Sequence, residues 1–99
     1  MVEEINVENF NEKISEGKVL VDCYAVWCGP CRMLGPIVDE VASEVTDYKF
    51  YKLNVDEAED IAKEYGIMSI PTLLIFENGE LKNKSVGFVS KEELKELVK

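Results

Sequence analysis

The stretch that most constrains the fold of this chain is Lys18 to Ala25, KVLVDCYA, which is apolar at most positions. Side chains alternate between the two faces of a sheet, so a strand that is apolar on both faces is covered on both, as central parallel strands are. Helices on the two sides of a sheet provide that cover. Asp22 is the one acidic residue in the stretch, and its carboxyl is predicted to be buried on whichever face it lies.

Strand and helix patterns alternate along the rest of the chain. Strands are predicted over residues 2–5, 48–55, 72–76 and 81–86. Helices are predicted between Asn6 and Gly17, from Cys31 to about Val45, between Asp56 and Gly66, and from Ser90 onward. Asn6, Asp56 and Ser90 are suitable N-caps, and a glutamate follows the last two after three residues, as in a capping box.

Asn78-Gly79 is a strong signal for a type I′ turn, so residues 81–86 should return antiparallel to residues 72–76. The other strands are joined through helices, and such connections predict right-handed crossovers and parallel pairing. The predicted fold class is α/β, a central mixed sheet of about five strands with a parallel core and an antiparallel edge hairpin, flanked by about four helices on both faces. No repeat or linker divides the chain, so residues 1–99 are predicted to form a single domain.

Charge and hydropathy argue against several classes of partner. Acidic residues outnumber basic ones 20 to 11 and the formal net charge is −9, so neither nucleic acid nor an anionic membrane is an expected partner. No apolar run approaches the roughly 20 residues of a membrane span. The opening segment, MVEEINVENF, lacks the pattern of a secretion signal. We therefore expect a monomer in the reducing cytoplasm.

The chain has three cysteines and no histidine. An odd number of cysteines excludes a complete framework of structural disulfides, and a zinc site normally needs four Cys or His ligands. No metal site is therefore predicted. A site shared between two chains or completed by carboxylates stays open at this point, and so does a pair of inert structural thiols.

Cys28 and Cys31 stand three residues apart, after the predicted buried strand and at the start of a helix. This spacing places both sulfurs on one side of the helix, close enough to form a bond. Free backbone N–H groups at a helix N-terminus favour negative charge, so a thiolate on Cys28 is predicted to be stabilised. Pro30 suits the first helical turn, and Gly29 leaves the approach to Cys28 open.

The five residues Trp27 to Cys31, WCGPC, are the active-site signature of the thioredoxin family, and the chain resembles that family from end to end. The other matching stretches are Asp22, Lys52-Leu53-Asn54, Tyr65-Gly66-Ile67, Ile70-Pro71-Thr72, Asn78-Gly79 and Gly87. The resemblance implies the thioredoxin fold and the activity of a general protein-disulfide reductase that works by reversible dithiol–disulfide exchange.

The resemblance also implies the roles of the two cysteines. Cys28, partly exposed, is the nucleophile, and Cys31 is the resolving thiol that closes the redox-active Cys28–Cys31 disulfide. No bound cofactor is implied besides that disulfide. The implied partners are disulfide-containing proteins and a flavin-dependent thioredoxin reductase that uses NADPH to reopen the disulfide.

The residues alone leave two interpretations of Asp22: a buried acid paired with arginine or lysine, or a proton acceptor beneath the dithiol. Burial disfavours the charged form, so the pKa of Asp22 is predicted to rise. The resemblance favours the second interpretation and implies that Asp22 takes the proton of Cys31. It also implies that Lys52, in one of the matching stretches, modulates the charge of Asp22.

The resemblance further implies that the Ile70–Pro71 peptide bond is cis and lies against the dithiol. The Ile70 backbone would then pair with an extended substrate peptide, as an added strand does. The predicted substrate-binding surface is flat and apolar and consists of Trp27, Gly29, Pro30, Ile70, Pro71, Val86 and Gly87.

Cys23 stands where the family commonly has an aromatic residue. It is predicted to be a small buried hydrophobe, with a third redox-active thiol as the alternative. Two other functions stay open on the same fold. One is a disulfide oxidase or isomerase, although such relatives tend to carry histidine between the cysteines. The other is a non-enzymatic binding subunit.

Overall fold

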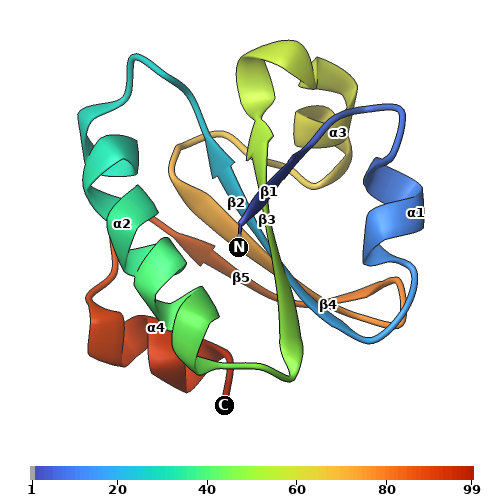
Figure 1. The fold of residues 1–99 in the computed structure, drawn as a ribbon. Coiled ribbons are helices and arrows are strands. Elements are labelled where there is room, and N and C mark those ends of the chain that lie inside the picture. Colours follow the sequence, from blue (N-terminus) through green and yellow to red (C-terminus); the bar gives the residue numbers. More distant parts are fainter. Residues whose placement is uncertain (1) are drawn as a thin grey trace.

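The protein is described by a computed structural model in which residues 2–99 are placed. A five-stranded sheet with the order β1-β3-β2-β4-β5 forms its centre (Figure 1). The strands are β1 (Glu3–Ile5), β2 (Lys18–Tyr24), β3 (Tyr48–Asn54), β4 (Thr72–Glu77) and β5 (Glu80–Val86). The predicted mixed sheet is confirmed, and β2, the stretch predicted to be covered on both faces, is its central strand.

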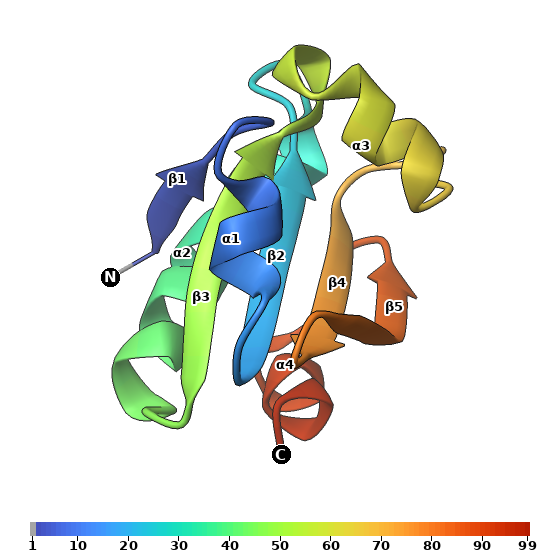
Figure 2. The same cartoon turned by 90° about the vertical axis from the view of Figure 1, so that its right-hand side faces the viewer.

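Helices cover both faces of the sheet, as predicted. They are α1 (Phe10–Ile14), α2 (Gly29–Glu44), α3 (Glu59–Glu64) and α4 (Lys91–Leu97), with a 3₁₀ turn, η1 (Val55–Glu57), before α3. α1 and α3 pack on one face, and α2 and α4 on the other (Figure 1). The start of α2 lies at the end of the sheet where β2 and β3 finish, whereas α4 and the C-terminus lie at the opposite end (Figure 2).

Two apolar clusters hold the helices to the sheet. Val21 belongs to the cluster on the α1/α3 face and Leu20 to the cluster on the α2/α4 face, as the alternation along β2 predicts. In the first cluster, the ring of Phe76 meets Phe10 and Tyr65 edge-on, at centroid distances of 5.9 and 5.4 Å. These contacts join β4 to α1 and to the residue that ends α3.

The prediction that β4 runs parallel to its neighbour is wrong, because β4 pairs antiparallel with β2. The other interior pairings, β2 with β3 and β3 with β1, are parallel as predicted. The reason is the shortness of α3. Its six residues rise about 9 Å, whereas the seven residues of β3 extend about 23 Å, so α3 does not return the chain along the strand. The connection stays at the end where β3 finishes, and β4 starts there (Figure 2).

Two of the predicted N-caps are also wrong. Asn6 caps a turn instead of a helix: its side chain accepts hydrogen bonds from two following backbone N–H groups, and α1 begins later, at Phe10. Asp56 forms no capping box with Glu59, because it lies inside η1, where the Asn54 side chain accepts a hydrogen bond from its N–H. The Asp56 carboxylate is thereby left for a different contact, described below.

Two other local predictions are confirmed. Ser90 and Glu93 form a reciprocal capping box at the start of α4. Asn78 and Gly79 have φ angles of 52° and 85°, both positive, as a type I′ turn requires. Asn78 also exchanges two hydrogen bonds with Gly17, which tie the β4–β5 hairpin to the loop before β2.

We expect Phe76→Ala to lower the free energy of unfolding by about 3–5 kcal/mol, because the ring is fully buried and its removal leaves a cavity. Urea denaturation of the variant and the parent protein measures this difference. Leu81→Ala, at a side chain 38% exposed on β5, is the control and should change stability by less than about 1 kcal/mol. A loss for Phe76→Ala no larger than that of the control would contradict the packing described for the α1/α3 face.

Candidate active site

The two cysteines of the WCGPC motif lie where the chain enters α2. Cys28 is the N-cap residue of this helix, and Pro30 lies in its first turn. A disulfide joins Cys28 to Cys31, so the structure shows the oxidised form. The backbone N–H of Cys31 donates a hydrogen bond to Cys28 Sγ, with an N···S distance of 3.2 Å. The start of the helix therefore directs a donor at this sulfur.

Exposure does not distinguish the two cysteines in the oxidised form. Each is 5% exposed, whereas the sequence predicts that Cys28 is the partly exposed member. Both pack in one cluster with Ala25 and Ile70, and this packing shields the closed disulfide from water. The backbone next to it is open, because a Cβ added at Gly29 would meet no atom within 4 Å.

The loop before β4 lies against the disulfide. The Ile70–Pro71 peptide bond is cis, and the carbonyl oxygen of Ile70 lies 3.8 Å from Cys28 Sγ. A disulfide sulfur carries no proton, so this approach is a contact and not a hydrogen bond. The N–H of Gly87 donates to the carbonyl of Pro71 at 2.8 Å, which brings Val86 and Gly87 to the same loop.

Trp27 stands beside the disulfide with 66% of its surface exposed. Its indole N–H donates a hydrogen bond to Asp56 Oδ2 at 2.8 Å. This contact is not predicted from the sequence, in which Asp56 has the pattern of a helix N-cap. The one sequence signal for such a contact is Trp27 itself, because an indole N–H usually finds a hydrogen-bond acceptor. The hydrogen bond holds an exposed ring in one orientation and links the active-site loop to η1.

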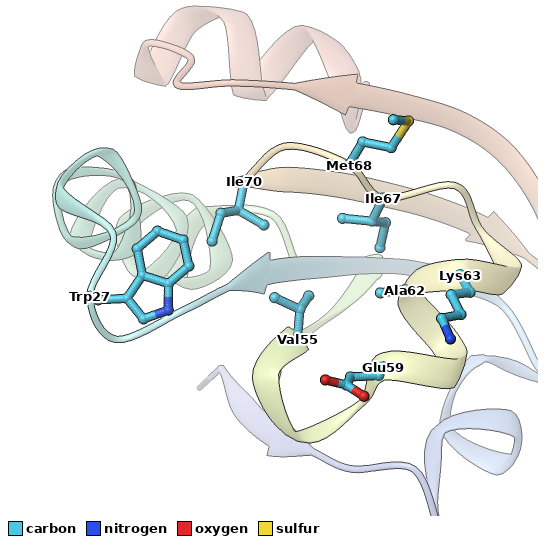
Figure 3. Close-up of a pocket in the computed structure, with 8 residues that line it drawn as sticks. All are labelled: Trp27, Val55, Glu59, Ala62, Lys63, Ile67, Met68 and Ile70. Carbon is cyan, nitrogen blue, oxygen red and sulfur yellow. The ribbon is translucent and has the colours of Figure 1, made fainter.

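A groove of about 490 Å³ opens between Trp27 and α3 (Figure 3). Trp27 and Ile70, two residues of the predicted substrate-binding surface, line this groove. The rest of its lining was not predicted and comes from Val55, Glu59, Ala62, Lys63, Ile67 and Met68. The other predicted surface residues, Gly29, Pro30, Pro71, Val86 and Gly87, are not part of the lining. No local pattern could have revealed the groove, because segments distant in the sequence form it.

Asp22 is 4% exposed in the middle of the sheet. Its Oδ1 has no hydrogen-bond partner among residues 2–99. Loss of water contact raises the pKa of Asp22 from 3.8 to about 7, while the charge of Lys52 lowers it and that of Asp39 raises it by smaller amounts. A carboxyl with this pKa both accepts and returns a proton near neutral pH.

The interpretation of Asp22 as a buried ion-paired acid is wrong for the part of the chain that the structure describes. Lys52 lies directly opposite Asp22 on β3, but its side chain is exposed and the two form no ion pair. The charge of Lys52 still lowers the pKa of the Asp22 carboxyl, although the two groups form no ion pair.

Cys23 is fully buried on the α1/α3 face of β2. Burial, with the charge of Asp22 as a smaller cause, strongly raises the pKa of its thiol. The thiolate is the reactive form of cysteine, so this environment favours a packing role for Cys23.

Other kinds of site are not evident within residues 2–99. No helix there is long and apolar enough to cross a bilayer. No group of three or more Cys, Asp or Glu side chains in that range is placed to hold a metal ion. The fold and the dithiol at the head of α2 instead define the class of the protein, which is a thiol–disulfide oxidoreductase.

Comparison with known proteins identifies the family within this class. The family model described as Thioredoxin matches residues 1–99. The chain is 54% identical to the thioredoxin of Mycoplasmoides gallisepticum over 82 residues, which cover 83% of this chain and 82% of that protein. It is 49% identical to the thioredoxin of Bacillus subtilis over 92 residues, 92% of this chain and 88% of that protein. It is 50% identical to the chloroplastic M-type thioredoxin of Pisum sativum over 100 residues, 98% of this chain and 58% of that protein. The chain belongs to the thioredoxin family, as the resemblance predicts.

The raised pKa of Asp22 predicts a pH dependence of stability. Between about pH 4 and pH 7 the unfolded chain loses the Asp22 proton and the folded chain keeps it, so the fold loses stability as the pH rises, and the full penalty is present above about pH 7. We expect Asp22→Asn to escape this penalty. The stability of the variant relative to the parent should be greater at pH 8 than at pH 4 by about 4 kcal/mol.

Urea denaturation of both oxidised proteins at the two pH values measures this difference. Comparing the two pH values cancels the constant cost of burying an amide. Asp60→Asn, at an exposed aspartate of α3, is the control and should show little difference between the two pH values. An Asp22→Asn effect that is equal at pH 4 and pH 8 would show that Asp22 titrates normally in the folded protein.

Proposed function

We propose that the protein is a general protein-disulfide reductase in which Cys28 attacks, Cys31 resolves and Asp22 accepts the proton of Cys31. The observation that carries the proposal is the Cys28–Cys31 disulfide at the head of α2, which follows the strand that buries Asp22. The family match supports thiol–disulfide exchange, and the geometry of the site supports the assignment of roles.

The first step is the attack of Cys28. In the reduced protein, the N–H of Cys31 and the other free N–H groups of the first turn favour a thiolate on Cys28. This thiolate attacks one sulfur of the substrate disulfide. The substrate S–S bond breaks, its second sulfur leaves as a thiolate that takes a proton from water, and a mixed disulfide forms. The Ile70 carbonyl, 3.8 Å from Cys28 Sγ, is placed to pair with the extended substrate backbone.

The second step is the attack of Cys31. Its thiol must lose a proton first, and a carboxylate with a pKa of about 7 is a suitable acceptor. The Cys31 thiolate attacks Cys28 Sγ, the bond from Cys28 to the substrate breaks, and the second substrate thiol is released. Two electrons have then passed from the dithiol to the substrate, and the protein is left with the disulfide that the structure contains. Asp22 later returns its proton to solvent.

Two features of the motif favour reduction over oxidation or isomerisation. The chain has no histidine, the residue that oxidases and isomerases on this fold tend to carry between the cysteines. Pro30 stands there instead, and its fixed φ in the first turn stiffens the loop in a form compatible with the closed disulfide. A stable disulfide makes its dithiol a better electron donor.

The partners follow from this direction of reaction. Substrates are proteins with accessible disulfides, and they dock on the groove between Trp27 and α3 (Figure 3). The oxidised protein must be reduced again, and we assign this step to a flavin-dependent thioredoxin reductase that draws on NADPH. A reducing compartment such as the cytoplasm suits the cycle, because the dithiol form is then replenished.

The cysteine variants test the proposed roles. We expect Cys28→Ser to reduce the rate of dithiothreitol-driven insulin reduction to the uncatalysed rate, because the attacking sulfur is gone. Cys31→Ser should accumulate a mixed disulfide with insulin, visible by mass spectrometry, because nothing resolves it. Cys23→Ala is the matched control and should keep the parent activity. Full activity without Cys28 would contradict its assignment as the nucleophile, whereas a parent protein that does not accelerate the reaction would support a non-enzymatic role.

Trp27→Ala tests the docking groove. We expect it to lower kcat/KM for insulin about tenfold, the effect of losing a modest interface hot spot. The rate with hydroxyethyl disulfide, which is too small to fill the groove, should change much less. Met33→Ala, at a side chain that is 65% exposed and does not line the groove, is the control of equal exposure. Equal losses with both substrates would show that Trp27 acts on the sulfur chemistry and not on docking.

A further inference from the structure

Three charged side chains lie in a row across the sheet on its α2/α4 face. Val2, Leu20 and Phe50 pack into the apolar cluster of that face. Leu20 and Phe50 lie on β2 and β3, and side chains two residues further along these strands point to the same face. On β1, Ile5 packs on the other face, so its neighbour Glu4 points to this one. These side chains are Glu4 on β1, Lys52 on β3 and Asp22 on β2.

The register of the strands makes the three residues direct neighbours. Glu4 is opposite Lys52, and Lys52 is opposite Asp22. Neighbouring strands are about 4.8 Å apart, so the backbones at Glu4 and Asp22 are separated by about 10 Å. Lys52 lies between two acids and forms an ion pair with neither of them in the described chain.

A hydrogen bond fixes the outer acid. The Tyr24 hydroxyl donates to Glu4 Oε2 at 2.6 Å. Since β3 lies between β1 and β2, the Tyr24 side chain reaches across β3 to make this bond. Glu4 is exposed on a three-residue edge strand, and without the bond its side chain would be free to move into solvent.

We propose that Glu4, anchored by Tyr24, is a positioning residue of the exchange reaction whose charge offsets that of Lys52 and makes Asp22 a stronger proton acceptor for Cys31. This inference rests on the role of Asp22 proposed above. Glu4 does not touch the reacting sulfurs and acts through the charged row alone.

The direction of the effect follows from the order of charges. The Lys52 ammonium favours the ionised form of Asp22 and lowers its pKa. A fixed carboxylate on the far side of Lys52 opposes this effect and also repels the charge of Asp22. At about 10 Å, the separation of the two backbones, one unit charge changes the proton affinity between about twofold and about sixteenfold for effective dielectric constants of about 80 to 20.

The other groups around Asp22 do not provide a fixed negative charge in register with Lys52. Asp39 on α2 raises the pKa of Asp22, as Glu4 is proposed to do, but among residues 2–99 no hydrogen bond anchors the Asp39 carboxylate. β4 contributes the uncharged Leu73 opposite Asp22, and the Cys28–Cys31 disulfide carries no charge. The anchored acid in register with Lys52 is therefore Glu4.

Glu4→Gln tests the proposal, because the amide oxygen still accepts the Tyr24 hydrogen bond and only the charge is lost. The titration of Asp22 is followed by carboxyl ¹³C NMR in the oxidised protein, and the pH profile of insulin reduction is recorded beside it. We expect the Asp22 midpoint and the inflection of the profile to fall together by about 0.3 to 1.2 pH units, which corresponds to a change in proton affinity of about twofold to sixteenfold.

Two further variants separate charge from fold. Glu3→Gln removes the same charge one residue away, on the opposite face of the sheet, where Glu3 pairs with Lys13 at 3.4 Å, and it should move the midpoint much less. Tyr24→Phe should produce part of the Glu4→Gln shift by releasing the carboxylate into solvent. In the double variant it should add nothing to Glu4→Gln, because Tyr24 acts through Glu4.

An unchanged Asp22 midpoint in Glu4→Gln would overturn the inference, and so would an equal shift in Glu3→Gln or a shifted midpoint with an unshifted reaction profile. Failure of the proposed role of Asp22 is recognised separately. In that case Asp22→Asn itself would leave the rate and pH profile of insulin reduction unchanged, whatever the NMR titration of the parent protein shows.

Discussion

The burial of β2 on both faces is the constraint on which the rest of the site depends. Because helices cover both sides of this strand, Asp22 has lost its contact with water wherever it points, and its proton affinity rises as a consequence. The same strand ends immediately before the active-site loop and so delivers Cys28 to the first N–H groups of α2. One packed strand thus raises the proton affinity of a buried carboxyl and positions Cys28 beside the N–H groups that favour an ionised thiol.

Most of the fold could be predicted from the sequence because its elements carry local patterns. The apolar pattern of β2, the Asn78-Gly79 turn and the Ser90 cap each act within a few residues, and the structure contains all three. The direction of β4 could not be predicted in this way. It depends on whether the connection through α3 crosses the sheet, which is a property of helix length and docking and not of any local pattern.

The candidate site also has parts that local sequence patterns predict and parts that depend on contacts between distant segments. The two cysteines and Asp22 could be singled out from the sequence because motif, spacing and expected burial all point to them. The contact between Trp27 and Asp56 could not, because Asp56 also has the pattern of a helix N-cap. The groove lining and the position of Glu4 beside Lys52 could be identified only from the strand order and register, because they join segments far apart in the chain. Long-range electrostatics is the part of such a site that sequence patterns describe least.

The active-site disulfide and α4 lie at opposite ends of the sheet, and this arrangement has a practical consequence. The dithiol, the groove and α3 gather at one end of the sheet, and the chain ends at the other (Figure 2). A fluorophore or a solid support attached after α4 would therefore stand away from the disulfide and the groove. This end of the sheet is therefore suited to attachment in immobilised or sensor formats that leave the disulfide end of the molecule unobstructed.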